Sequence, residues 1–260
     1  MVKGLDIFKE HFREYSDHYI LIGGGACDVQ FSQKNIDFRR TKDLDLVLIV
    51  EGLTSEFVNK FWEFIKAGEY AIAEVDFRKC FYRFVKPVVD GYPHMLELFA
   101  RRPDVIIVAP DFHITDIPTG EEASSLSAIL MDDDYYSFTI AKSELIDGIR
   151  VASDIALIVL KAKAFLNNRQ RKEEGIQVQS VDIQKHKNDV IRLTAILTPD
   201  TSITIPEVIR NDLREYIQVL RGEESKIQSS IQKMGLGNIT LADIIERLEK
   251  VFSLTAQTSA

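Results

Sequence analysis

The sequence predicts an α+β fold, with a mixed sheet and flanking helices in residues 1–152 and a mainly helical region in residues 153–260. Short apolar runs of strand length alternate with helical patterns up to about residue 151, whereas amphipathic helical patterns follow one another afterwards. The hydrophobic content of 45% and charged content of 28% are those of an ordinary globular protein, so composition excludes global disorder.

The first elements are predicted by the spacing of apolar residues. Residues 5–15 form a helical pattern, which consists of Leu5, Phe8, Phe12 and Tyr15. The apolar run 18–22 predicts a short strand that ends in Gly23-Gly24-Gly25, and a helix is expected from Cys27. Residues 44–50 are so apolar and so few that they fit only an interior strand, which places Asp43 and Asp45 at its start.

Later elements follow in the same way. A helix is expected at 56–67, then strands at 71–89 and 94–100 that form a hairpin through the turn at 89–93. Residues 123–134 are expected to be a loop and residues 135–151 a further β-type stretch. The second part is predicted to contain helices at 154–171, 181–197, 206–220, 224–234 and 241–252, with a frayed tail from 255.

Bulk properties exclude several classes of protein. The net charge of -8 disfavours a strongly basic nucleic-acid surface, although a local basic patch remains compatible with it. Two cysteines, Cys27 and Cys80, cannot build a disulfide framework or a four-ligand zinc site and suit a reducing compartment. We find no secretory signal pattern and no apolar stretch of membrane-spanning length, so we expect a cytoplasmic protein with no membrane partner.

Asp43 and Asp45 are the first candidates for chemistry. Residues two apart in a strand face the same way, about 7 Å apart at their Cα atoms, so both carboxylates would lie on one face. Magnesium takes one or two carboxylates together with substrate phosphates. The alternative is a solvated strand end, which an isolated Asp-x-Asp most often is. A calcium loop is excluded, because Leu48 stands where that loop requires glycine.

Glu97 is the candidate for a third acid, because it is a lone carboxylate within an apolar strand. Its burial would require a metal ion or a salt bridge. Glu74 and Asp76 form a rival pair that could equally face solvent. The glycines before the helix could let backbone amides approach a triphosphate, or could form only a tight turn.

The motifs together resemble a known family. Gly23-Gly24-Gly25-Ala26 followed by Arg39-x-Thr41-x-Asp43-x-Asp45 resembles the signature of AbiEii/AbiGii-type nucleotidyltransferases, a branch of the polymerase-β-like superfamily. Residues 148–164 look like the strand and lysine-bearing helix of that family, and residues 185–189 look like its second basic motif. The resemblance covers about residues 18–197. It implies a nucleotidyltransferase-like fold in which Asp43, Asp45 and Glu97 are catalytic and bind Mg²⁺.

The resemblance also implies a set of nucleotide-binding residues, namely Gly24, Gly25, Arg39, Thr41, Lys161, Lys187 and Asp189. Lysines would neutralise the charge of a nucleoside triphosphate as pyrophosphate leaves. Lys161 and Lys163 cannot share a helix face, and Lys161 matches the family's lysine better. Arg39 could instead cover the strand edge, and Thr41 could cap the turn.

The expected activity is the magnesium-dependent transfer of a nucleoside monophosphate from a triphosphate to an acceptor. A tRNA or a protein is a candidate acceptor. The resemblance further implies a toxin of a bacterial toxin–antitoxin or phage-defence system, with an antitoxin protein as a candidate partner. The alternative is a nucleotide-binding or protein-interaction module that has the same fold and has lost catalysis.

Overall fold

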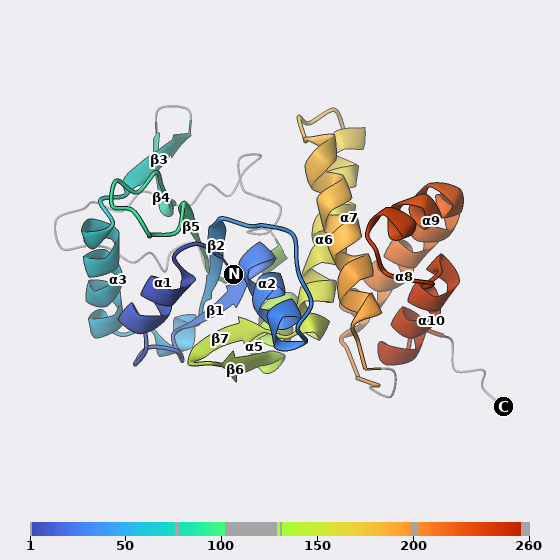
Figure 1. Ribbon diagram of the computed structural model, residues 1–260, viewed down its shortest axis with the longest axis horizontal. Coiled ribbons are helices and arrows are strands. Elements are labelled where there is room, and N and C mark those ends of the chain that lie inside the picture. The colour runs from blue at the N-terminus through green and yellow to red at the C-terminus, as the bar shows by residue number, and fades with distance from the viewer. Residues whose placement is uncertain (1, 76–77, 102–128, 131, 199–201, 256–260) are drawn as a thin grey trace. The chain divides into compact units, whose positions relative to one another are not determined.

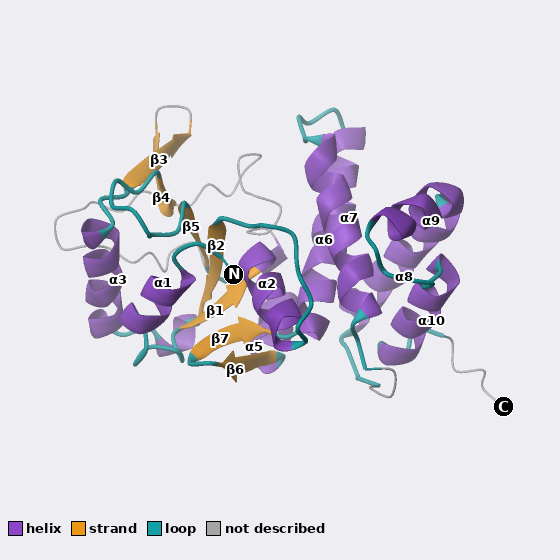
Figure 2. Cartoon of the chain, in the orientation of Figure 1, coloured by secondary structure: helices purple, strands orange, loops and turns teal. Residues whose placement is uncertain are grey.

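The computed structural model describes residues 2–75, 78–101, 129–130, 132–198 and 202–255. The chain divides into two compact units, residues 1–153 and 154–260, where the sequence predicted a boundary between residues 152 and 153. The first unit is a mixed sheet with helices and the second consists of helices, so the fold is α+β (Figures 1 and 2).

The first unit is built on a sheet that has seven strands in the part of the chain described. Its order is β3-β4-β5-β2-β1-β7-β6. Strand β2 runs parallel to β5 and antiparallel to β1. The strands are β1 (Tyr19–Ile22), β2 (Asp43–Leu48), β3 (Ala71–Val75), β4 (Arg78–Val85), β5 (Met95–Phe99), β6 (Ser143–Ile146) and β7 (Ile149–Ala152). The helices are α1 (Leu5–His11), α2 (Gly23–Gln33), the short 3₁₀ helix η1 (Val50–Gly52), α3 (Ser55–Ala67) and α5 (Asp133–Ala141).

Helices α1, α2 and α3 pack on the same face of this sheet (Figure 1). The ring of Phe8 in α1 lies 5.2 Å from that of Tyr19 in β1, and Trp62 in α3 lies 5.7 Å from Phe84 in β4. Gly25 of α2 lies close against the side chain of Leu44 in β2. Phe84 and Leu44 are both paired with Leu96 of β5, so these contacts belong to one face.

The opposite face of the same strands carries the acids. Side chains alternate along a strand, so Asp43 and Asp45 point away from the face on which Leu44 lies. The predicted start of this strand at the two aspartates is confirmed, since β2 begins at Asp43. The sequence therefore separates an apolar layer under the helices from a polar row on the other side.

Several predictions about this unit were wrong. Residues 135–151 were expected to be β-type throughout, but α5 occupies Asp133–Ala141 before β6 and β7 begin. Its N-cap Asp132 accepts hydrogen bonds from the backbone N–H groups of Asp134 and Tyr135, which starts the helix despite its β-favouring residues. The helix after β1 begins at Gly23, not at Cys27. The single strand expected at 71–89 is two antiparallel strands, β3 and β4, and the last two residues of the loop expected at 123–134 belong to α5. The predicted hairpin is confirmed, since β4 pairs with β5 in the antiparallel direction.

The second unit contains only helices among the residues described. They are α6 (Asp154–Glu173), α7 (Ser180–Ala195), α8 (Glu207–Gly222), α9 (Glu224–Lys233) and α10 (Leu241–Val251). Helix α6 packs along both α7 and α8. The core of the second unit includes Ile191, Leu213 and Leu248, whose exposure is at most 1%. In the described ranges, no helix has both the length and the apolar character needed to cross a membrane.

Candidate active site

Three charged side chains form one row across the sheet. In the backbone register, Arg83 of β4 lies opposite Glu97 of β5, and Glu97 lies opposite Asp45 of β2. Paired residues on neighbouring strands face the same way and are separated by roughly 5 Å, so the row places Glu97 between a cation and a second carboxylate. Asp43 lies on the same face of β2, and 41% of its side chain is exposed. We call the three carboxylates, Asp43, Asp45 and Glu97, the acidic row.

Glu97 is the buried member of the acidic row. Its carboxylate accepts a hydrogen bond of 2.6 Å from an Nη atom of Arg83, and the side chains are 8% and 31% exposed. Burial raises the pKa of Glu97, the charge and hydrogen bond of Arg83 lower it, and the nearby Asp43 raises it, with a net result above the usual value. The sequence predicted that a metal ion or a salt bridge would compensate this carboxylate, and the structure shows the salt bridge.

The N-terminus of α2 lies directly beside Asp45. Gly23 has a positive φ of 66°, and a Cβ atom built on it would lie 1.8 Å from Oδ2 of Asp45. No other residue type fits there unless the carboxylate moves. Ile22, the N-cap of α2, provides no side-chain hydrogen bond to the first turn. The first-turn N–H groups of this 11-residue helix therefore point out at the aspartate end of the sheet.

The predicted nucleotide-binding residues of the first unit are assembled around the same glycines. A Cβ on Gly24 would lie 2.8 Å from Oγ1 of Thr41 and 3.7 Å from Nη2 of Arg39. Gly25 is buried under Leu44, so it serves the close packing of α2 on the sheet. The guanidinium of Arg39 also lies over the ring of Phe38 at 5.1 Å, which holds this cation near the helix N-terminus.

Sequence reasoning missed two residues of the site. Arg83 is one, since only the register of β4 against β5 brings it to Glu97. His94 is the other, because its Nδ1 lies 3.7 Å from Oδ1 of Asp43 at the exposed edge of the acidic row. The backbone N–H of His94 donates to the carbonyl oxygen of Lys42, which extends the pairing of β2 with β5 by one residue.

The carboxylates of the site provide only part of the ligand set that a magnesium ion requires. Within the described ranges, no three His, Cys, Asp or Glu side chains converge closely enough to hold a metal ion. Glu97 is bound to Arg83 instead of turning toward the aspartates. Asp43 and Asp45 still supply two carboxylates on one strand face, which is the protein donor set that magnesium takes when phosphate oxygens complete its coordination.

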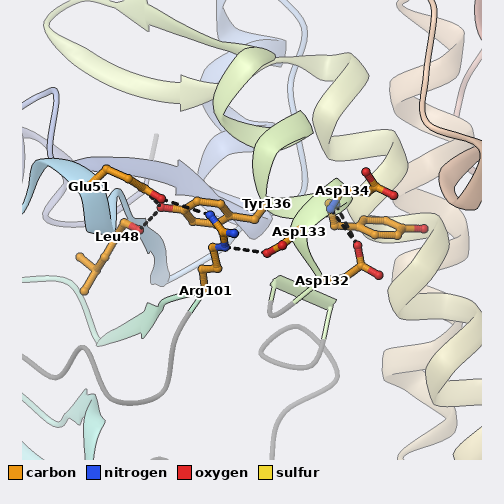
Figure 3. Close-up of polar contacts among 8 residues, drawn as sticks. Leu48, Glu51, Arg101, Asp132, Asp133, Asp134 and Tyr136 are labelled. Carbon is orange, nitrogen blue, oxygen red and sulfur yellow. Dashed lines mark hydrogen bonds and ion pairs between the residues drawn. The ribbon is translucent and has the colours of Figure 1, made fainter.

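The opposite ends of β2 and β5 are held by a separate polar network (Figure 3). Arg101 follows β5 and binds Glu51, which follows β2, at 3.3 Å and Asp133 of α5 at 2.6 Å. The hydroxyl of Tyr136 donates to Glu51 at 2.8 Å. This network links the segments that follow β2 and β5 to α5, at the end of the strands away from the aspartates.

The predicted residues of the second unit lie in two ion pairs, of which only the pair of Lys161 and Asp189 is buried on both sides. Nζ of Lys161 in α6 donates to Asp189 of α7 at 2.8 Å, with side chains 6% and 1% exposed. Nζ of Lys187 donates to Glu223 at 2.6 Å, with 6% of the Lys187 side chain exposed. The predicted placement of Lys187 among apolar residues is thus confirmed, and the nucleotide-binding role of all three residues stays a prediction.

Lys163, the alternative to Lys161, also has an acidic partner. Its Nζ donates to Asp212 of α8 at 2.8 Å, and the two side chains are 26% and 14% exposed. Lys161 is therefore the more buried of the two lysines. The rival acids Glu74 and Asp76 lie outside the residues whose side chains the structure describes.

Comparisons with protein-family models, with curated proteins and with solved structures give no match to this chain. Its function is therefore inferred from the residues of the site.

Proposed function

We propose that the protein is a magnesium-dependent nucleotidyltransferase. One observation carries the proposal: Asp45 and Glu97 are paired residues on neighbouring strands and lie on one face of the sheet, beside Asp43 and the glycine-rich N-terminus of α2. Carboxylates for a hard cation and backbone N–H groups for phosphates are thus placed at the same end of the sheet. In the proposed reaction an acceptor oxygen attacks the α-phosphorus, the bond to the β-phosphate oxygen breaks, and pyrophosphate leaves.

Each residue of the first unit has a defined role in this proposal. Asp43 and Asp45 hold the magnesium ion, which when bound acts as a Lewis acid on phosphate oxygens. Glu97 is the third acid. Gly24 would allow the triphosphate to approach the first turn of α2, and Gly25 would contribute its backbone N–H there. Arg39 and Thr41 would make further contacts with the nucleotide.

Lys161, Lys187 and Asp189 complete the proposed nucleotide-binding set. The lysines would supply positive charge to the departing pyrophosphate, and Asp189 would position Lys161 through their 2.8 Å hydrogen bond. Both lysines are paired with acidic side chains, so each lysine would have to release its acidic partner in order to bind a phosphate group. A tRNA or a protein is the proposed acceptor, and a toxin with an antitoxin partner is the proposed biological setting.

The activity is tested by incubating the protein with α-labelled nucleoside triphosphates and Mg²⁺, with total tRNA, protein and small-molecule acceptors. We expect label transfer that EDTA abolishes. The variants Asp43→Asn and Asp45→Asn should each lose at least about a hundredfold in rate, because electrostatic contacts to a transferring phosphoryl group are worth about 3 kcal/mol or more.

The matched control is Asp134→Asn, which removes an exposed carboxylate from the first turn of α5. It should transfer label at the rate of the unchanged protein. Equal label in the unchanged protein and in the Asp43→Asn and Asp45→Asn variants would contradict the proposal for every acceptor tried.

A second candidate function is a nucleotide-binding or interaction module that lacks catalysis. The ion pair between Arg83 and Glu97 favours it, because this pair already neutralises the third acid. Calorimetry distinguishes the two functions. The module predicts nucleotide binding that depends on neither Mg²⁺ nor Asp43 and Asp45, whereas the enzyme predicts that binding weakens when either is removed.

A further inference from the structure

We infer that Arg83 is a positioning residue whose guanidinium group holds the carboxylate of Glu97. A divalent ion gains Glu97 as a ligand only by displacing Arg83. The inference rests on the proposed function. It names a residue outside the sequence motifs and assigns it control over how many carboxylates a metal ion can use.

The geometry of the acidic row is the first argument. Glu97 lies between Arg83 on one neighbouring strand and Asp45 on the other, all on one face of the sheet. A rotation of the Glu97 side chain therefore exchanges one neighbour for the other without any movement of the backbone. The 2.6 Å hydrogen bond shows that Glu97 is turned toward Arg83 in this structure.

The balance of charge and burial is the second argument. Glu97 is 8% exposed and is paired with Asp45 on the neighbouring strand, so a positive neighbour is needed to compensate the burial of its carboxylate. Arg83 supplies that charge without metal. Its own side chain is 31% exposed, so Arg83 can move toward solvent when a divalent ion replaces it.

The exchange has a measurable consequence for the affinity of the metal. A metal ion that takes Glu97 as a ligand must first break its charge-assisted hydrogen bond to Arg83, so the presence of Arg83 should weaken metal binding through Glu97 by about tenfold or more. Removing Arg83 should abolish that competition. Arg83→Gln should then bind Mn²⁺, a probe for the magnesium site, about tenfold more tightly than the unchanged protein.

The experiment measures Mn²⁺ binding by calorimetry and by the electron paramagnetic resonance signal of unbound Mn²⁺, without nucleotide, on the full chain. A double-mutant cycle supplies the specific readout. Arg83→Gln should gain affinity, and the same change made in a Glu97→Gln background should gain none. Arg101→Gln is the matched control, because Arg101 is 33% exposed and is also paired with acids just after β5. It should leave Mn²⁺ affinity unchanged.

Unchanged or weaker Mn²⁺ binding by Arg83→Gln would overturn the inference, and so would an equal gain in Arg101→Gln or in the Glu97→Gln background. If Arg83→Gln does not fold, Arg83→Lys replaces it, because a lysine keeps the charge but loses the forked geometry and should give a smaller gain. The two proposals fail differently. If Asp43→Asn and Asp45→Asn abolish Mn²⁺ binding while Arg83→Gln changes nothing, only the inference about Arg83 falls. If the unchanged protein binds no Mn²⁺ either alone or in a repeat with a non-hydrolysable nucleoside triphosphate, the proposed magnesium site falls.

Discussion

At the scale of single residues, Gly23 is a position where one added methyl group should displace a proposed metal ligand. Its φ is 66°, and an added Cβ would lie 1.8 Å from Oδ2 of Asp45. We predict that Gly23→Ala displaces the Asp45 carboxylate, lowers the free energy of unfolding by about 1–2 kcal/mol through backbone strain, and removes most Mn²⁺ binding. Thermal unfolding and Mn²⁺ titration of the same preparation measure both effects.

Gly148 provides the control for this prediction. Its φ is 84°, but the nearest atom to an added Cβ is Cε of Lys9 at 3.8 Å, so Gly148→Ala introduces strain without a clash. This variant should lose similar stability and retain Mn²⁺ binding. If both variants retain binding equally, Gly23 does not position Asp45.

The residues of the site differ in how far the sequence reveals them. Asp43 and Asp45 could be predicted to share a face, because alternation along a strand is a local property. Arg83 could not be predicted to contact Glu97, because their pairing depends on the register of two strands. His94 was missed for a similar reason, since its nearness to Asp43 follows from the alignment of β5 with β2.

At the scale of elements, the ion pair of Lys187 and Glu223 joins α7 to the junction of α8 and α9. The hydrogen bond from Lys187 is the largest cause that holds the pKa of Glu223 below its usual value. A carboxyl group whose pKa is lower in the folded state binds fewer protons there than in the unfolded state. Its contribution to stability is therefore present above the usual pKa and is lost as the pH falls through the folded value.

We therefore predict that the difference in unfolding free energy between the unchanged protein and Glu223→Gln shrinks as the pH is lowered from about 6 to about 3. Urea unfolding at a series of pH values measures it. Glu224→Gln, which changes the neighbouring exposed acid, should show a much smaller dependence on pH. A difference for Glu223→Gln that stays constant with pH would show that the pair does not stabilise this junction.

Helix α5 shows why one element was predicted wrongly. Tyr135, Tyr136, Phe138 and Thr139 favour strands by residue type, yet all four are buried on one side of a helix. The cap at Asp132 and the bond from Tyr136 to Glu51 are the interactions that fix it as a helix (Figure 3). The bond to Glu51 comes from far away in the sequence, so local propensity could not reveal it.

At the scale of the whole molecule, each of the two compact units has its own core, and the single tryptophan lies in the first. Trp62 is 6% exposed on α3, so its fluorescence reports the first unit. Leu213 is 1% exposed in α8 of the second unit, and Leu213→Ala should destabilise that unit by about 2–5 kcal/mol. We predict that the part of the far-ultraviolet circular dichroism transition contributed by the helices of the second unit moves to lower urea, while the fluorescence transition stays in place.

Leu46→Ala in β2 is the converse variant, since Leu46 is 1% exposed in the first unit and should move the fluorescence transition. Equal shifts of both signals in both variants would show that the chain unfolds as one cooperative body. The α+β character and the helical second half were predictable from the sequence, because both follow from the periodicity of apolar residues. The order of the strands was not, since it depends on long-range pairing.

The alternation of β2 also bears on the fidelity of folding. Leu44, Leu46 and Leu48 alternate with Asp43, Asp45 and Val47, and a slip of the strand by one position would turn both aspartates into the layer packed by α1, α2 and α3. Two unpaired carboxylates in that layer would be strongly unfavourable. The aspartates therefore select the correct alignment of the central strand, and replacing both with apolar residues would make misaligned and aggregating forms more accessible during synthesis of the chain.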